Sequence, residues 1–199
     1  MRKITREEIL GFQDWERVRP VLRPLFIHEK ERRRLTVGSH LTFLFENTAT
    51  LWYQVEEMLR VERMTDADAI QHEIDTYNDL IPDAGQLSAT LLIEFAEAKE
   101  RDAALRRLVG IEKNLWLKIG EQKMSVSFDE GQISSERVSS VQFVRFNVGV
   151  DAEAFLKLAE TGQLAIRVEH PNLAAEAIIS GHLAAALAED LKSETEMTR

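Results

Sequence analysis

The hydrophobic and polar positions of this chain follow two periods, one typical of β-strands and one typical of helices. Leu41, Phe43 and Phe45 alternate with polar residues, and Asn47 followed by Thr48 is typical of a tight turn. The pattern therefore predicts a β-hairpin in which residues 35–47 pair with residues 50–55.

Alternation recurs further along the chain. Residues 87–95 place apolar side chains on one face of a strand, and the runs 115–119 and 124–128 flank Gly120 as a second hairpin. Residues 139–148 predict one more strand, and a short strand at 164–168 follows.

The other segments show helical spacing. Thr5 and Glu8 have the spacing of a capping box and open a first helix, which Pro20 and Pro24 separate from a second one at about 25–34. Further helices are predicted at 65–81, 98–109, 151–160 and around 179–191.

The order of these elements predicts an α+β fold, with an antiparallel sheet of about six strands, two hairpins and flanking helices. No linker divides the chain, so we expect a single domain over residues 1–199. Within it, residues 1–34 form a basic helical N-terminal segment and residues 192–199 a frayed tail.

Charge is unevenly distributed along the chain. The net charge is -9, yet residues 1–34 hold ten Lys or Arg against six Asp or Glu. An acidic body argues against nucleic-acid binding, and the absence of a long apolar run argues against a membrane span or a signal peptide. We therefore expect a cytoplasmic protein. The absence of cysteine excludes disulfides and thiolate chemistry.

Arg32, Arg33 and Arg34 form the one clear basic run in the sequence. We interpret it as a solvent-exposed helix end, where cations are favoured by the helix dipole. The alternative is contact with a phosphate, a carboxylate or an acidic partner.

Several polar residues occupy positions whose spacing points them toward apolar neighbours. In the helix predicted at 65–81, Glu73 falls within the buried stripe, whereas His72 lies on the opposite face. A buried carboxylate is costly unless it is paired, so such groups are expected to pair or to bind a ligand or metal. The candidate ligand-binding residues are Tyr53, Gln54, Glu57, Arg60, Glu73, Tyr77, Glu94 and Arg145.

Other interpretations of these residues stay open. Glu57 and Arg60 are three apart, which suits a simple ion pair within one helix. A metal site would need distant residues to converge, and its weak candidates are Glu57, Glu73, Glu94 and His170. His170, which precedes Pro171, is more typical of a structural hydrogen bond than of catalysis.

Sequence motifs exclude several enzyme classes. The Glu-x-x-His pairs of di-iron carboxylate proteins and the paired histidines of zinc enzymes are absent. The glycine-rich motifs of dinucleotide, P-loop and serine hydrolase sites are absent as well.

Several segments resemble an uncharacterised bacterial domain-of-unknown-function family of cytoplasmic proteins. They are Arg33 to Gly38, Phe45-Glu46, Tyr53-Gln54, Glu57-Met58, Arg60, Glu62, Tyr77 to Pro82, Ala89-Thr90, Glu94, Gly110, Ser139 to Phe146 and His170-Pro171. Genes of that family often lie beside genes for rubrerythrin-like proteins and iron-sulfur oxidoreductases, so the resemblance implies a role in oxidative stress or electron transfer. Relatives often carry His where this chain has Gln142, so the resemblance does not favour a His-dependent metal site on that strand.

The sequence and the resemblance together predict an accessory or ligand-binding protein of a bacterial redox or oxidative-stress system. A rubrerythrin-like or iron-sulfur protein is the expected partner. One alternative is a metal-dependent enzyme with a glutamate general base, and another is a purely structural polar core in an interaction protein. The sequence assigns no cofactor, catalytic residue or oligomeric state.

Overall fold

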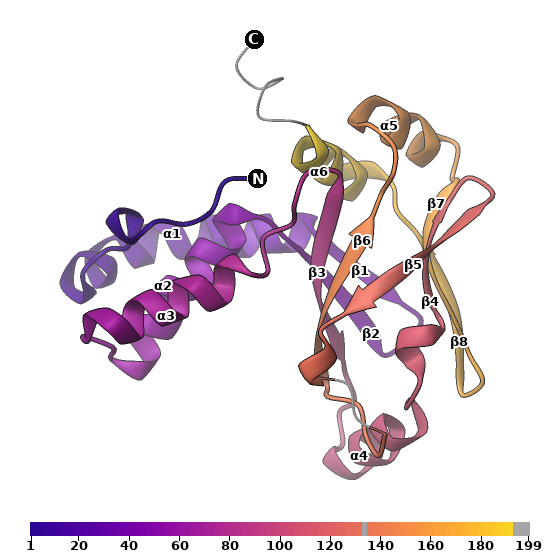
Figure 1. Cartoon of the computed structure of the whole chain (residues 1–199), viewed down its shortest axis with the longest axis horizontal. Coiled ribbons are helices and arrows are strands. Elements are labelled where there is room, and N and C mark those ends of the chain that lie inside the picture. The colour runs from indigo at the N-terminus through magenta and orange to yellow at the C-terminus, as the bar shows by residue number, and fades with distance from the viewer. Residues whose placement is uncertain (133–134, 193–199) are drawn as a thin grey trace.

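A strongly curved antiparallel sheet forms the centre of the computed structural model, which describes residues 1–132 and 135–192. Its strands within these ranges are β1 (Arg34–Val37), β2 (Leu41–Glu46), β3 (Gln86–Ile93), β4 (Leu115–Ile119), β5 (Gln122–Phe128), β6 (Val141–Asn147), β7 (Leu164–His170) and β8 (Leu173–Ile178). They lie in the order β1-β2-β3-β6-β5-β4-β7-β8. Because β1 and β8 at the two ends of this order contact each other, the sheet forms a nearly closed barrel (Figure 1).

Apolar side chains fill the interior of the barrel. On β3, Leu87, Ala89, Leu91 and Ile93 are all buried, which confirms the face predicted from their alternation. They pack with inward residues of the other strands in one continuous hydrophobic core. The interior is therefore a packed core, and the open polar surface of the sheet is its outer face.

Helices flank the barrel at three places. They are α1 (Phe12–Arg32), α2 (Thr48–Glu62), α3 (Ala67–Asn78), α4 (Ala98–Arg107), α5 (Ala152–Glu160) and α6 (Gly181–Leu191). In Figure 1, α5 and α6 lie at one end of the barrel and α4 at the other, while α1, α2 and α3 project to one side. Within the described part of the chain, no helix is both long and apolar enough to cross a bilayer.

We call residues 1–32 and 48–81 the helical module, because they share a second hydrophobic core. Leu51, Val55 and Leu59 recur every four residues on α2 and meet Ile70 and Ile74 of α3. This spacing buries one face of each helix against the other. The stripe predicted for α3 is therefore confirmed.

The prediction of a strand at residues 50–55 was wrong, because these residues belong to α2. The Asn47 side chain caps this helix: its Oδ1 accepts from the N–H of Thr50 at 2.9 Å, and the Thr50 hydroxyl accepts from the N–H of Asn47 at 2.9 Å. Asn47 is thus a helix cap and not a turn residue. The hairpin itself lies earlier, between β1 and β2, with Gly38 at φ 65° in the turn.

The predicted break at Pro20 and Pro24 was also wrong, since α1 continues through both residues. Each proline removes a backbone hydrogen bond, but both are exposed, so water can reach the freed carbonyls. Packing of Trp15, which is 1% exposed, holds the helix on α2. Tertiary contact therefore overrides the local preference of proline.

The sheet has two more strands than the predicted six within the described residues. The missed strands are β1, which had been merged with β2, and β8. Three alanines give β8 a helix-like composition, yet its residues alternate between half-buried and exposed while it pairs with β7. The tail predicted to fray lies almost entirely outside the described residues, from 193 onward.

The interpretation of the arginine run as a solvent-exposed helix end was wrong for Arg33. It is 2% exposed and pairs with Glu29 and Asp190, whereas Arg32 and Arg34 are partly exposed. The carboxylate alternative therefore holds for the central arginine of the run.

Candidate functional site

Glu57 is the centre of a hydrogen-bonded network between α1 and α2. Its Oε1 accepts from Nε1 of Trp15 at 3.1 Å and from Nε of Arg19 at 2.6 Å, and its Oε2 accepts from Nη2 of Arg19 at 2.8 Å. Nε of Arg60 donates at 3.2 Å, which confirms the predicted ion pair within α2. The hydrogen bonds from Arg19, supported by the one from Trp15, lower the pKa of Glu57 to about 2. Glu57 is therefore fully engaged in holding the two helices together.

Tyr53 and Gln54 lie one turn before Glu57 and complete the contact with α1. The ring of Tyr53 stacks on Phe26 with centroids 4.5 Å apart, and burial raises its pKa, with the charge of Glu57 adding to the effect. Gln54 Oε1 accepts from Nζ of Lys30 at 3.0 Å. These two residues thus also use α1 as their partner.

Glu73 and Tyr77 are half-buried on α3, one turn apart. Burial raises the pKa of Glu73, and the negative charge of Glu62 raises it further. Burial also raises the pKa of Tyr77, and here Glu73 adds to it. Glu73 forms no ion pair within the described residues, whereas Glu57 pairs with Arg19 and Arg60, and His72 is exposed, as its spacing predicted.

The predicted convergence of Glu57, Glu73 and Glu94 beside an arginine was wrong. Glu94 is exposed just beyond the end of β3, where its N–H donates to the carbonyl of His40 at 2.8 Å. Strand alternation alone could not show that this position lies at the end of β3 remote from α3. Arg145 is exposed on the outer face of β6.

The weak metal candidates do not assemble either. His170 is 6% exposed: its Nδ1 accepts from the N–H of Asn172 at 3.2 Å, so its Nε2 donates to the carbonyl of Val109 at 3.0 Å. Both nitrogens are thus used in structural hydrogen bonds, as predicted. No group of three or more His, Asp or Glu side chains suited to a metal ion occurs in the part of the chain that the structure describes.

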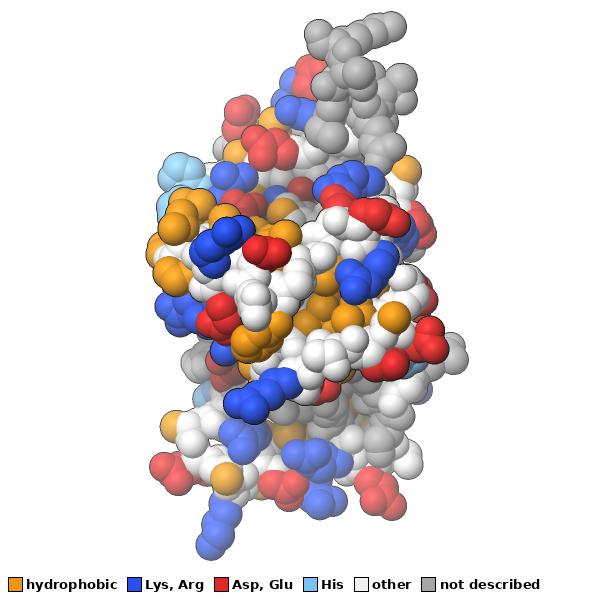
Figure 2. Space-filling view, turned by 90° about the vertical axis from the view of Figure 1, so that its left-hand side faces the viewer, with side chains coloured by type: hydrophobic (Ala, Val, Ile, Leu, Met, Phe, Trp, Pro, Cys, Tyr) orange, Lys and Arg blue, Asp and Glu red, His pale blue; other side chains and the backbone are white. Residues whose placement is uncertain are grey.

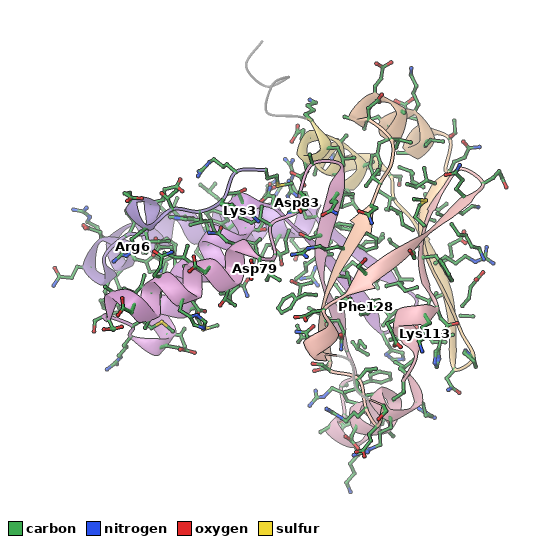
Figure 3. All side chains as sticks on the ribbon, in the orientation of Figure 1. Lys3, Arg6, Asp79, Asp83, Lys113 and Phe128 are labelled. Atoms are coloured by element: carbon green, nitrogen blue, oxygen red, sulfur yellow. The ribbon has the colours of Figure 1, made fainter. Side chains whose placement is uncertain are left out.

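A different cavity, of about 340 Å³, lies between the end of α3 and the outer face of the sheet. We call it the interlayer cavity. Figure 3 shows Asp79 at the end of α3 and Phe128 at the end of β5 on its two sides. Its lining residues are Glu46, Asp79, Leu80, Ser88, Ala89, Ser127, Phe128, Asp129, Phe143, Val144 and Arg145.

Four of the polar lining residues form a single row across four strands. The strand register pairs Glu46 of β2 with Ser88 of β3, Ser88 with Arg145 of β6, and Arg145 with Ser127 of β5. Neighbouring strands lie about 4.8 Å apart, so a carboxylate, a hydroxyl, a guanidinium and a second hydroxyl stand side by side on one face.

The side chains of this row differ in the hydrogen bonds and ion pairs that they make. Glu46 is 6% exposed and accepts from the hydroxyls of Thr50 at 2.6 Å and Thr90 at 2.8 Å. Ser88 is 4% exposed, and its Oγ has no hydrogen-bond partner. Arg145 has no ion pair with any residue that the structure describes. Because a buried hydroxyl without a partner costs free energy, Ser88 marks the cavity as a place where a further polar group fits.

Sequence reasoning selected Arg145 but missed the other members of the row. The alternation that buries Leu41, Phe43 and Phe45 also turns Glu46 to the outer face, so the signal was present. That signal could not be interpreted from the sequence alone. The strand register sets Glu46 beside Ser88, and the helical module covers both residues. The segments of the family resemblance that include Glu46, Asp79 and Arg145 meet at this cavity.

Comparison with known proteins supports that resemblance. Residues 3–191 match the model of a family described as a protein of unknown function, DUF3501. The chain belongs to this family.

A solved structure shows the same fold. The chain is similar to a protein of unknown function from Burkholderia pseudomallei, with 37% sequence identity and a TM-score of 0.85. The match covers 96% of this DUF3501 chain and 100% of that chain. No match was found among curated proteins. Neither description mentions rubrerythrin or oxidative stress, so the function has to be argued from the site.

Proposed function

We propose that this DUF3501 protein is a binding protein for a small polar molecule, which occupies the interlayer cavity. The observation that carries the proposal is the Ser88 hydroxyl, which is buried, lines the cavity and has no hydrogen-bond partner. Arg145 lies next to it in the row and is free of ion pairs within the described residues. A ligand that accepts from both groups would satisfy them together.

The charges around the cavity indicate the chemistry of the ligand. The guanidinium of Arg145 suits a carboxylate or a phosphate, which it can grip with two parallel hydrogen bonds. Asp79, just after α3, and Asp129, just after β5, also line the space with carboxylates, which suit hydroxyl or ammonium donors. A volume of about 340 Å³ is near the lower limit for ligand pockets, so the ligand is small. Hydroxy acids, amino acids and sugar acids meet these requirements.

Glu46 supports a binding role better than a catalytic one. Its two oxygens already accept from Thr50 and Thr90, so it fixes the base of the cavity. The network of Glu57 fits the purely structural alternative, because Arg19, Trp15 and Arg60 satisfy it within the protein. A metal-dependent enzyme is not favoured by any group of side chains that the structure describes.

The test is a ligand screen against matched variants. Purified protein is titrated with hydroxy acids, amino acids and sugar acids, first by thermal shift and then by calorimetry. We expect at least one to bind with a Kd below about 1 mM. Arg145→Gln should weaken that binding about tenfold or more, since it removes a charge-assisted contact. Ser88→Ala should weaken it less and leave stability unchanged or improved.

Arg107→Gln is the matched control, because Arg107 is an exposed arginine at the end of α4. It should bind every ligand as the wild type does. The proposal is contradicted if no compound of the three classes binds, or if Arg145→Gln binds them as tightly as Arg107→Gln.

A second role, docking of a redox partner, is proposed from the family resemblance and one surface of the helical module. Val21 and Leu25 of α1, one turn apart on the same side of the helix, are 70% and 62% exposed, within the basic segment 1–34. Such a surface suits an acidic partner with exposed apolar residues. Co-purification with a rubrerythrin-like or iron-sulfur protein from the native host, abolished by Leu25→Ser, would support this role. Recovery of the protein without either partner would contradict it.

A further inference from the structure

Glu56 and Glu57 are consecutive on α2 but lie in opposite environments. Glu57 faces α1 and receives hydrogen bonds from three side chains. Glu56 is 1% exposed, and within the described residues its one hydrogen bond comes from the backbone N–H of Leu10, at 2.7 Å from Oε1. Burial raises the pKa of Glu56 to about 7, against the opposing effects of Leu10 and the charge of Arg6. Near neutral pH it is therefore a carboxyl group that can both donate and accept.

This carboxyl lines a cavity of about 230 Å³ at the end of the helical module, which we call the Glu56 cavity. Figure 2 looks onto that end of the molecule and shows apolar side chains gathered in a hollow between polar ones. Most of the lining is apolar and comes from Leu10, Phe12, Trp15, Leu59, Met64 and Ile70. The occupant therefore needs an apolar body.

The charged groups of the lining are few and are largely positive. Arg6 comes from the N-terminal segment, and Glu56 and Arg60 come from α2, whereas α1, residues 64–65 and α3 contribute uncharged side chains. Arg6 makes no ion pair within the described residues, and Figure 3 shows it at this end of the molecule. Arg60 uses Nε for Glu57 and approaches Glu16 to 3.8 Å, so N–H groups of its guanidinium are left for a ligand.

We propose that the Glu56 cavity is a second binding site, which takes a small monocarboxylic acid with an apolar chain. The carboxylate lies toward Arg6 and Arg60, and the neutral carboxyl of Glu56 donates a hydrogen bond to it. The chain contacts the apolar lining. An amine of the same size is disfavoured because both guanidiniums repel it. This site is separate from the interlayer cavity and does not depend on the function proposed there.

Three compounds with the same six-carbon chain and different head groups test which ligand charge the cavity prefers. Hexanoate, hexan-1-ol and hexylamine are titrated into the full-length protein by calorimetry at pH 6. We expect hexanoate to bind most tightly and hexylamine to bind least. Binding of hexylamine equal to or tighter than that of hexanoate overturns the proposal, and so does the absence of hexanoate binding.

The role of Glu56 predicts a pH dependence that a merely structural residue would not produce. Hexanoate stays ionised between pH 6 and pH 8, while Glu56 loses its proton in this range. If only the neutral form of Glu56 accepts the anion, the apparent Kd rises about tenfold from pH 6 to pH 8. Glu56→Gln keeps a neutral donor at both pH values, so hexanoate binding should become independent of pH.

Arg6→Gln and Arg107→Gln complete the experiment. Arg6→Gln should weaken hexanoate binding severalfold at both pH values, while Arg107→Gln, remote on α4, should leave it unchanged. A pH dependence that survives in Glu56→Gln, or equal affinities of the two arginine variants, would overturn the assignment of this site.

Discussion

Arg33 donates to both carboxylate oxygens of Asp190 and thereby joins the end of the long α1 helix to α6 of the barrel. Nη1 of Arg33 lies 2.5 Å from Oδ2 of Asp190, and Nη2 lies 3.0 Å from Oδ1. Arg33 also forms an ion pair with Glu29. The side chains of Arg33 and Asp190 are only 3% and 7% exposed. This contact holds the helical module against the barrel, and with it the position of the interlayer cavity between them.

Breaking this pair should be costly. Arg33→Met leaves the carboxylate of Asp190 buried without its main partner, and we expect the free energy of unfolding to fall by about 3–5 kcal/mol. Urea denaturation at pH 7 measures the change. Arg34→Met is the control, since Arg34 is 37% exposed and lies 3.7 Å from Glu31, and it should change stability by less than about 1 kcal/mol. Equal effects of the two substitutions would refute the structural role of Arg33.

Stability should fall in acid because of Glu57. Its pKa is about 2 in the folded protein, against 4.5 without its partners, so the unfolded chain takes up the proton first as the pH falls. The contribution is fully present above pH 4.5 and is lost between pH 4.5 and pH 2. We expect it to be about 2 kcal/mol, discounted because the carboxylate is still partly solvated. Urea denaturation at pH 6 and pH 3 should show a smaller difference for Glu57→Gln than for the wild type.

Glu56 should have the opposite effect. Burial raises its pKa to about 7, so between pH 4.5 and pH 7 the folded state holds a proton that the unfolded chain has released. Its contribution therefore becomes unfavourable as the pH rises through this range, by about 2–3 kcal/mol at pH 8. Glu56→Gln should raise the unfolding free energy at pH 8 and change it little at pH 4. A loss of stability at pH 8 would show that the carboxylate form is favoured in the fold.

Adding a side chain at Gly38 should lower the stability of the protein. Its φ is 65°, and a Cβ at this position would lie 3.1 Å from the Cβ of Ala175 on β8. Gly162 has a similar φ of 69° but open space around it. Gly162→Ala should cost about 1 kcal/mol for backbone strain alone, and Gly38→Ala should cost clearly more. Thermal unfolding of the two variants gives the comparison, and equal losses would mean that the contact with Ala175 is easily relieved.

The sequence was most informative where one face of an element is buried. Alternation found β3 with its inward face, and helical spacing found α3, because burial on one side leaves a periodic signature in the sequence itself. Local preference failed where a distant contact decides the structure. Asn47 caps α2 instead of closing a turn, and α1 continues through Pro20 because Trp15 and Arg19 fasten it to α2.

The candidate site was harder to predict than the fold. The pair of Glu57 and Arg60 was predicted from their spacing on one helix, but Tyr53 and Gln54 fell in a predicted strand. The partners of Glu57 and Gln54 on α1 were not predicted. The row from Glu46 to Ser127 depends on the register of four strands, which no single segment encodes. The prediction was therefore limited mainly by not knowing which remote segments pair, and less by the identity of the residues.

The contact between Gly38 and Ala175 lies where the two outermost strands of the sheet meet. A free strand edge is a template on which other molecules can pair and aggregate. Since β1 and β8 face each other, each shields the other from such pairing without a shared backbone ladder among the described strands. Gly38 lies at this seam, and we expect chains in which the seam opens to be the first to form intermolecular β-structure.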